Sequence, residues 1–264
     1  MSADGLAAIW LCGLGLVALA YFARLYRQSD YDTWESCLYL PTYLLGRLLW
    51  RVQFRNLPPP ELQSGAILAA NHRSSVDPFF VQLAARRRVH WMVAQEYCRH
   101  ALFGPLLRAL QVIPTNRSGL DTAATKAALR ITKAGRLVGM FPEGRLNMTA
   151  GPLLPLRGGA ALVAMRSQVP LIPLWISGSP LGKSVWSPLL MPARVTITFG
   201  RPIYPPPPEA AAESQKSASR TGGELAHSDA LILEWGTQIL ALAGRSNQPA
   251  QLASQRKLRN RTDE

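Results

Sequence analysis

The sequence predicts an α/β fold: a central, mostly parallel sheet flanked by helices, with membrane-associated helices at the N-terminus. Two observations predict this class. From about residue 60 to residue 203, short apolar runs of strand length alternate with segments of helical periodicity. Before them stands a long apolar stretch without charge, residues 5–22. A chain of 264 residues is long enough for one such domain with additions at each end.

The apolar N-terminal stretch has the length of a membrane helix. Its 18 residues just suffice to cross a hydrocarbon core of about 30 Å. Asp4 precedes it, and Arg24 and Arg27 follow it, which favours a cytoplasmic location for the rest of the chain. A cleaved signal peptide is the alternative, but no basic segment precedes the apolar run. We expect residues 1–27 to form a transmembrane or membrane-dipping helix.

A second apolar stretch lies within residues 28–58 and is interrupted by Pro41. Its leucines fall at helical spacing with arginines beside them, at Leu44, Leu45, Leu48, Leu49, Arg47, Arg51 and Arg55. This pattern favours an amphipathic helix that lies in the membrane interface. An ordinary core helix is the alternative.

The alternating pattern places an α/β domain over residues 59–204. We expect its strands at 66–70, 89–94, 112–115, 136–141, 170–176 and 195–199. We expect helices between them at 78–85, 98–110, 121–134 and 157–167. Because proline cannot donate a hydrogen bond to a sheet, the strand with two prolines, 170–176, is expected at an edge or as an irregular strand.

The C-terminal part changes in composition. Residues 205–226 are rich in Pro, Ala and Ser, which is typical of a linker. Residues 227–244 have the pattern of a helix, and residues 245–264 are polar and basic, which predicts a disordered tail.

The composition favours a membrane partner over nucleic acid. Lys and Arg total 29 against 16 Asp and Glu, a formal net charge of +13 that attracts polyanions. Neither zinc-finger spacing nor an RNA-binding aromatic signature is present, and 48% of the residues are hydrophobic. We therefore expect membrane lipids, and no nucleic acid, as partners. The three cysteines form no CxxC pair, so we expect neither a metal site nor a disulfide.

The sharpest local pattern, Asn71-His72-Arg73-Ser74-Ser75-Val76-Asp77, follows an apolar strand and precedes a helix. Ligands bind at the carboxyl ends of the strands in sheets of this class. An imidazole can take a proton from an alcohol near neutral pH, and Asp77 could orient the ring of His72. The alternatives are a structural histidine in a loop and a helix N-cap at Asp77 before Pro78.

Two further patterns place arginines after predicted strands. The segment Phe141-Pro142-Glu143-Gly144-Arg145 joins a glycine that permits a tight turn to an arginine that can bind phosphate. Glu143 could orient that arginine or contact a substrate hydroxyl. Arg117 follows another short strand. For each of these charges, a solvated position on the surface is the alternative.

Four segments in order resemble the 1-acylglycerol-3-phosphate acyltransferase family. They are Asn71-His72 with Asp77, then Arg117, then Phe141-Pro142-Glu143-Gly144, then Val169-Pro170-Leu171-Ile172-Pro173. The similarity covers about residues 60–203 and implies that residues 59–204 are an acyltransferase domain with the glycerol-3-phosphate acyltransferase-like fold.

The resemblance also implies roles for these residues. His72 would be the general base that deprotonates the acceptor hydroxyl, and Asp77 would orient it. The acceptor's phosphate and glycerol would be bound by Arg117, Glu143, Gly144 and Arg145. The acyl-chain side of the site would be formed by Val169, Pro170 and Pro173. The donor would be acyl-CoA or acyl-carrier protein, with no metal and no bound cofactor.

The implied reaction is acyl transfer to lysophosphatidate, which makes phosphatidate for phospholipid biosynthesis at the cytoplasmic face of the inner membrane. One departure matters, because the family's third motif usually reads Phe-Pro-Glu-Gly-Thr-Arg, whereas Arg145 follows Gly144 directly here. The acceptor could therefore be a different lysolipid. It is also open whether Arg145 or Arg157 binds the phosphate. A non-catalytic membrane lipid-binding protein with the same fold is the other alternative.

Overall fold

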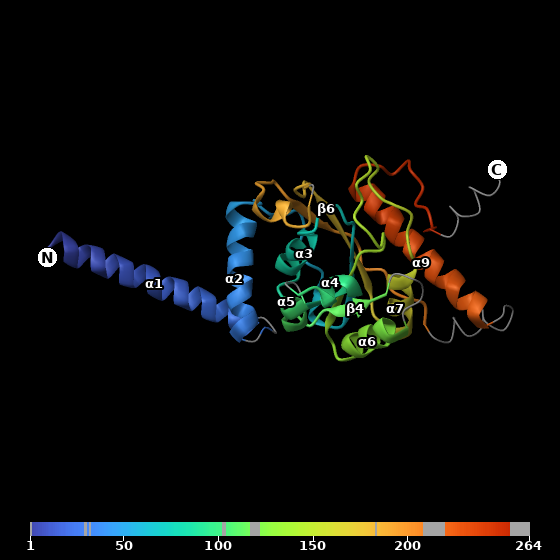
Figure 1. The fold of residues 1–264 in the computed structure, drawn as a ribbon, viewed down its shortest axis with the longest axis horizontal. Coiled ribbons are helices and arrows are strands. Elements are labelled where there is room, and N and C mark those ends of the chain that lie inside the picture. The colour runs from blue at the N-terminus through green and yellow to red at the C-terminus, as the bar shows by residue number, and fades with distance from the viewer. Residues whose placement is uncertain are drawn as a thin grey trace.

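The computed structural model describes residues 2–28, 31, 33–101, 104–116, 122–182, 184–207 and 220–253. Within this part of the chain, seven strands form one sheet in the order β1-β7-β6-β2-β5-β3-β4 (Figure 1). They are β1 (Gln53–Phe54), β2 (Ala66–Ala70), β3 (Val89–Ala94), β4 (Ile113–Thr115), β5 (Leu137–Met140), β6 (Leu171–Ser177) and β7 (Thr196–Phe199). Every neighbouring pair is parallel except β6 and β7. The predicted α/β fold with a mostly parallel sheet is therefore confirmed.

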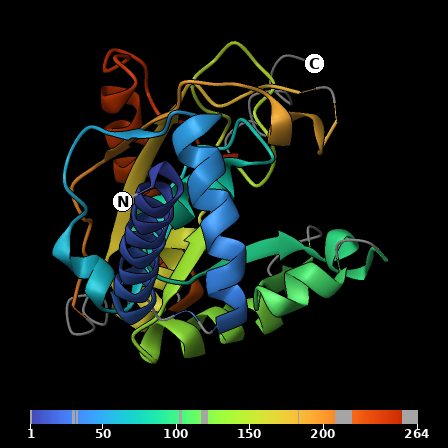
Figure 2. The same cartoon turned by 90° about the vertical axis from the view of Figure 1, so that its left-hand side faces the viewer.

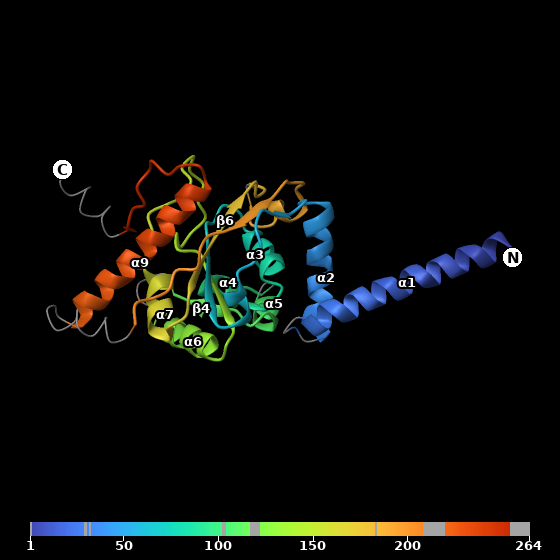
Figure 3. The same ribbon diagram turned by 180° about the vertical axis from the view of Figure 1, so that it is seen from behind.

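Helices cover both faces of the sheet. The described part of the chain contains the helices α1 (Ala3–Gln28), α2 (Thr33–Leu48), α3 (Asp77–Ala85), α4 (Gln95–Arg99), α5 (Gly104–Ala109), α6 (Thr122–Lys133), α7 (Gly159–Ser167) and α9 (Arg220–Leu242). Two short 3₁₀ helices join them, η1 (Pro60–Gln63) and η2 (Ser187–Leu190). Helices α6, α7 and α9 lie on the side away from α2 (Figure 3).

The central strand β2 shows why both faces are covered. Ile67 and Ala69 pack into the cluster beneath α7 and α9, whereas Leu68 and Ala70 pack into the cluster beneath α3. Alternate side chains of a strand point to opposite faces, so a strand that is apolar at every position requires a layer on each side. The loop after β2 is consequently held by a strand that is buried along its whole length.

The strand with two prolines lies inside the sheet, so the predicted edge position is wrong. Strand β6 pairs in parallel with β2 and antiparallel with β7. Pro170 precedes the strand. Pro173 faces the β7 side just beyond the last pair of that ladder, where its carbonyl accepts a hydrogen bond from the Gly200 amide at 2.8 Å. Because proline has no N–H, this pair keeps one of two possible hydrogen bonds, and the loss falls at the end of the β6–β7 ladder.

The predicted interfacial helix over residues 28–58 is shorter than expected. Helix α2 ends at Leu48 although it accommodates Pro41, and the chain then joins the sheet at β1. Arg51 adopts a left-handed backbone with φ of 44°, which breaks the helix. Trp50 and Val52 are both buried, and side chains two residues apart share a face in a strand. This strand-like spacing could not be recognised because the leucines of the same segment are spaced as in a helix.

The C-terminal boundaries also differ from expectation. Helix α9 begins at Arg220, inside the segment expected to be a linker, and residues 208–219 of that segment lie outside the described residues. Part of the expected disordered tail is ordered, because Leu252 is buried and pairs with Leu156. Residues 254–264 lie outside the described part.

Helix α1 projects away from the domain and meets the start of α2 (Figure 1). It exposes a series of large apolar side chains: Leu6, Ile9, Trp10, Leu11, Leu14, Leu16, Val17 and Leu19. Among the residues that the structure describes, no helix combines the length and the apolar character needed to cross a membrane. The spanning form of the predicted helix at residues 1–27 is thus not found there.

Candidate active site

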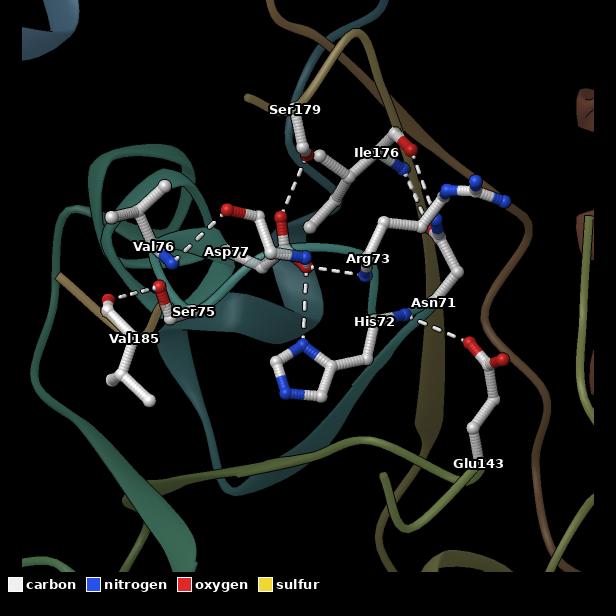
Figure 4. Close-up of polar contacts among 11 residues, drawn as sticks. Asn71, His72, Arg73, Ser75, Val76, Asp77, Glu143, Ile176, Ser179 and Val185 are labelled. Carbon is white, nitrogen blue, oxygen red and sulfur yellow. Dashed lines mark hydrogen bonds and ion pairs between the residues drawn. The ribbon is translucent and has the colours of Figure 1, made fainter. Parts of the chain in front are cut away.

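The loop that follows β2 carries the predicted histidine and is tied to the neighbouring strand by Asn71. The Asn71 side chain donates to the Ile176 carbonyl at 2.9 Å and accepts from the Ile176 amide at 2.7 Å. This pair of bonds fixes the carboxyl end of β2 against the end of β6 (Figure 4). His72 is therefore placed at the edge of the sheet where parallel strands end, as the sequence predicted.

His72 and Asp77 point toward each other (Figure 4). The His72 Nδ1 atom lies 3.1 Å from Asp77 Oδ2, and Asp77 is fully buried at the first turn of α3. A carboxylate can only accept, so in the neutral ring Nδ1 is the atom that carries the proton and Nε2 is the atom with the lone pair. The predicted pairing of these two side chains is present, and it leaves the imidazole arranged as a proton acceptor.

The carboxylate of Asp77 is held by three further donors. Its Oδ2 accepts the backbone N–H groups of Arg73 and Ser74 at 2.7 Å each. Its Oδ1 accepts the Ser179 hydroxyl at 2.7 Å, from two residues beyond β6. A buried carboxylate with all these partners has one orientation available, so the ring that it contacts is fixed as well.

A stack of aromatic rings fixes the plane of the imidazole. The centroids of His72 and Phe141 lie 3.8 Å apart with only 9° between the planes, and Trp91 stacks on the other side of Phe141 at 4.8 Å. Gly139 makes room for this stack, because an added Cβ would lie 2.7 Å from the Trp91 ring. Sequence reasoning missed the role of Trp91, since a lone tryptophan in a strand carries no signal beyond core packing.

Glu143 is buried and holds two backbone amides. Its Oε1 accepts the His72 N–H at 2.8 Å, and its Oε2 accepts the Leu154 N–H at 2.8 Å. Burial raises the pKa of the Glu143 carboxyl to about 7, and the Asp77 charge adds to this, while the two backbone hydrogen bonds and the Arg73 charge lower it. The contacts of Glu143 are with the loops of the site rather than with an open surface.

The loop after β5 is clamped to the histidine loop. The Asn147 amide donates to the His72 carbonyl at 2.7 Å. The Arg73 guanidinium donates to the carbonyls of Thr149 and Gly151 at 3.1 and 3.0 Å. Two loops that are far apart in sequence thus form one wall of the site, and the position of His72 depends on both.

The predicted phosphate-binding residues are less closely arranged. Gly144 has a φ of +68°, and an added Cβ there would lie 2.9 Å from the Arg157 side chain, so Arg157 covers this glycine. Arg145 and Arg157 are both exposed. Arg117 lies outside the described residues. Because Arg157 lies against Gly144, the structure brings it into the turn that carries Glu143.

The predicted acyl-chain residues do not lie together with His72. Val169 and Pro170 precede β6, which runs parallel to β2, so they sit at the opposite edge of the sheet from the end of β2. Pro173 is buried in the middle of β6 beside Gly200. The sequence run was treated as one unit, but a strand carries its two ends to opposite edges of the sheet.

Among the described residues, no group of three or more His, Cys, Asp or Glu side chains is arranged to hold a metal ion. The site that is present consists of an oriented imidazole, its buried carboxylate and an arginine-bearing turn at one edge of the sheet. The imidazole can take a proton at Nε2, and the exposed Arg145 and Arg157 can attract an anion.

Comparison with known proteins gives consistent matches. A family model described as Acyltransferase matches residues 51–177. The chain is 25% identical over 150 residues to a 1-acyl-sn-glycerol-3-phosphate acyltransferase of Bacillus subtilis, covering 56% of this chain and 70% of that protein. It is 28% identical over 172 residues to one of Streptococcus pneumoniae, covering 61% and 62%, and 30% identical over 141 residues to one of Limnanthes douglasii, covering 52% and 50%.

A solved structure gives the same fold. The 1-acyl-sn-glycerophosphate acyltransferase of Thermotoga maritima superposes with a TM-score of 0.51 over 80% of this chain and 92% of that chain, at 19% identity. The matches to the curated relatives span between half and 70% of their length.

Proposed function

We propose that this chain, whose residues 51–177 match the acyltransferase family model, transfers a fatty acyl group from a thioester to the free hydroxyl of lysophosphatidate, making phosphatidate. The observation that carries this proposal is the contact between His72 and buried Asp77 at the carboxyl edge of the sheet. It supplies a base for an alcohol without a covalent nucleophile.

The proposed reaction uses these two side chains in one pathway. Nε2 of His72 takes the proton of the acceptor hydroxyl while the oxygen attacks the thioester carbonyl. The tetrahedral intermediate then expels the thiolate, which takes the proton back from His72, so the ester forms and the free thiol leaves. Asp77 positions the ring and stabilises the imidazolium while it exists. The donor is acyl-CoA or acyl-carrier protein, and neither a metal nor a bound cofactor takes part.

We propose that the acceptor's phosphate is bound at the turn after β5. Arg145 and Arg157 both stand there, and a guanidinium can bind phosphate oxygens with paired hydrogen bonds. Arg157 is the better candidate because it lies against Gly144. Glu143, whose two oxygens already hold the amides of His72 and Leu154, is better suited to positioning His72 than to contacting glycerol.

We also propose that the protein is associated with the cytoplasmic face of the inner membrane. The exposed apolar side chains of α1 and the basic balance of the chain support this, since both favour an anionic bilayer. A lysolipid acceptor resides in the membrane whereas a thioester donor arrives from water, so an enzyme at the interface reaches both.

The proposal is tested with purified protein in detergent. Given acyl-CoA and a panel of lysolipids, the protein should acylate lysophosphatidate faster than lysophosphatidylglycerol or lyso-ornithine lipid. Faster acylation of another lysolipid would refute the acceptor while leaving the chemistry intact. Binding of lysolipid without any turnover would instead favour a lipid-binding protein.

A further inference from the structure

The loop between β6 and β7 exposes an unusual number of large apolar side chains. These are Leu181, Val185, Trp186, Leu190 and Met191, and Leu190 is 75% exposed. Single exposed apolar residues are normal on a protein surface, but five within eleven positions form a patch that usually has a partner.

This loop is built to hold its apolar side chains outward. The Ser187 amide donates to Ser184 Oγ at 3.1 Å, and the Ser187 hydroxyl donates back to the Ser184 carbonyl at 3.1 Å. Helix η2 follows, and Leu189 packs against the core. The polar groups of the turn therefore bond to one another, and Leu189 anchors the loop while its neighbour Leu190 points into solvent.

The loop continues into the surface of α2. The Ala193 amide donates to the Leu49 carbonyl at 3.1 Å, and the Val195 amide donates to the Trp50 carbonyl at 3.0 Å. Leu48, at the end of α2, is 75% exposed beside this contact. Figures 1 and 2 show the loop with η2 next to the C-terminal end of α2. The loop and the end of α2 are thus joined through their backbones, and we call the exposed apolar side chains of the loop together with Leu48 the loop–α2 surface.

The charged residues next to these exposed apolar residues in the chain are basic. Arg47, Arg51 and Arg194 are exposed and stand beside Leu48 and the loop in the chain. The sequence contains no Asp or Glu from residue 36 to residue 60, or from residue 144 to residue 208. Exposed apolar side chains on segments that carry arginines and no carboxylates complement an anionic lipid surface, where apolar side chains enter between headgroups and arginines meet phosphates.

The same loop is bonded to the segment that carries His72 and Asp77. The Ser75 hydroxyl donates to the Val185 carbonyl at 2.6 Å, and Ser179, at the start of the loop, donates to Asp77 (Figure 4). The loop–α2 surface is consequently joined directly to the mouth of the site that contains His72.

We propose that the loop–α2 surface docks on an anionic phospholipid bilayer, separately from the apolar helix α1, and so holds the opening of the His72 site against the lipid. The proposal rests on the proposed function only for the identity of the lipid that enters the site. It assigns to the catalytic domain a membrane contact of its own.

The test places a fluorescent probe on the surface in the full-length chain. Cys12, Cys37 and Cys98 are replaced by Ser, and one cysteine is introduced by Leu190→Cys and labelled with an environment-sensitive NBD group. Vesicles of phosphatidylcholine with phosphatidylglycerol should shift the emission to the blue and raise it. The matched control, Leu225→Cys on α9, carries the same probe on an exposed leucine away from this surface and should not respond.

Charge variants then test the role of the arginines. Arg194→Gln should raise the concentration of anionic vesicles needed for half of the emission change by roughly fivefold, the effect of one basic side chain near such a membrane. Arg245→Gln, an exposed arginine after α9, should leave it unchanged. Equal melting temperatures for the variants would show that the fold is retained.

The outcomes separate this proposal from acyl transfer. If the vesicles bind the protein but the probe at position 190 stays in water, α1 alone holds the membrane and the docking proposal is overturned. A blue shift without vesicles that grows with protein concentration would identify a contact between copies of the chain and overturn it too. The probe experiment does not measure turnover. A protein whose probe enters the bilayer but which shows no acyl transfer in the separate assay would refute only the proposed reaction.

Discussion

The loop at residues 71–77 and the segment at residues 144–157 are bonded to each other but are held differently. In the first, Asp77 is fully buried and bonds to His72, Arg73, Ser74 and Ser179. In the second, the side chains of Arg145 and Arg157 are exposed. A buried and saturated network fixes geometry, whereas exposed side chains retain rotamer freedom until a ligand orders them. Under the proposed function, the fold would set the proton-transfer step, and the exposed arginines would set the choice of acceptor.

The strongest way to break this comparison is to remove the imidazole. His72→Ala should lower the rate of acyl transfer by roughly 10³-fold, because a positioned general base contributes about 10²–10⁴-fold. The measurement is phosphatidate formed from labelled acyl-CoA. His100→Ala, at an exposed histidine outside the site, should retain the wild-type rate. If His72→Ala kept most of the activity, the fixed loop would not be the centre of the chemistry.

The second test concerns the pH dependence of folding. The pKa of Glu143 is about 7 in the folded protein against an ordinary value of 4.5, so the folded state binds more protons between these values. The contribution of Glu143 to stability is therefore present below pH 4.5 and is lost as pH rises through about 7, by up to about 3 kcal/mol. Glu143→Gln removes this titration.

Chemical denaturation from pH 4 to pH 8 measures the difference. The wild-type free energy of unfolding should fall relative to that of Glu143→Gln as the pH rises across this range. The variant also places an amide donor opposite one of the two backbone N–H groups, which costs about 1–3 kcal/mol at every pH. Parallel pH profiles for the two proteins would show that Glu143 does not titrate as its burial requires.

The third test removes the hydroxyl that sequence reasoning missed. Ser179→Ala should lower kcat by about tenfold with little change in KM, since one hydrogen bond of about 1.4 kcal/mol to Asp77 is lost and substrate contacts are not. Ser179→Thr keeps a hydroxyl and should restore most of kcat. Equal losses for Ala and Thr would mean that the position serves packing rather than the orientation of Asp77.

Much of the fold could be predicted because local patterns agreed with the tertiary structure. Strands β2 and β3 coincide with the predicted segments, since a buried parallel strand is a continuous apolar run between turn signals. The end of α2 could not be predicted, because Trp50 and Val52 satisfy a strand period within a helical pattern. The position of β6 inside the sheet depends on its pairing with β7, and no local sequence pattern shows that pairing.

The residues of the site also differ in how far the sequence could predict their contacts. His72 and Asp77 lie five residues apart, so one turn could be expected to bring them together. Ser179 is 102 residues from Asp77, and Trp91 reaches His72 only through Phe141. A contact made by pairing of distant strands leaves no mark in the spacing of a single sequence. Val169 and Pro170 were misplaced for the same reason, since the direction of β6 decides which end faces the site.

The smallest expected effect concerns the exposed arginines, and it tests the comparison between the two segments in the most detail. Arg157→Ala should raise KM for lysophosphatidate by about fivefold while kcat changes little, because one partly solvated guanidinium–phosphate contact is worth about 1 kcal/mol. Arg145→Ala, the matched arginine in the same turn, should have a smaller effect because Arg157 is the one that lies against Gly144. Steady-state kinetics at several acceptor concentrations separates the two constants. A larger rise in KM for Arg145→Ala would place the phosphate on Arg145, which directly follows Gly144. The missing threonine between these two residues would then change the position of the acceptor and not the arginine that binds it.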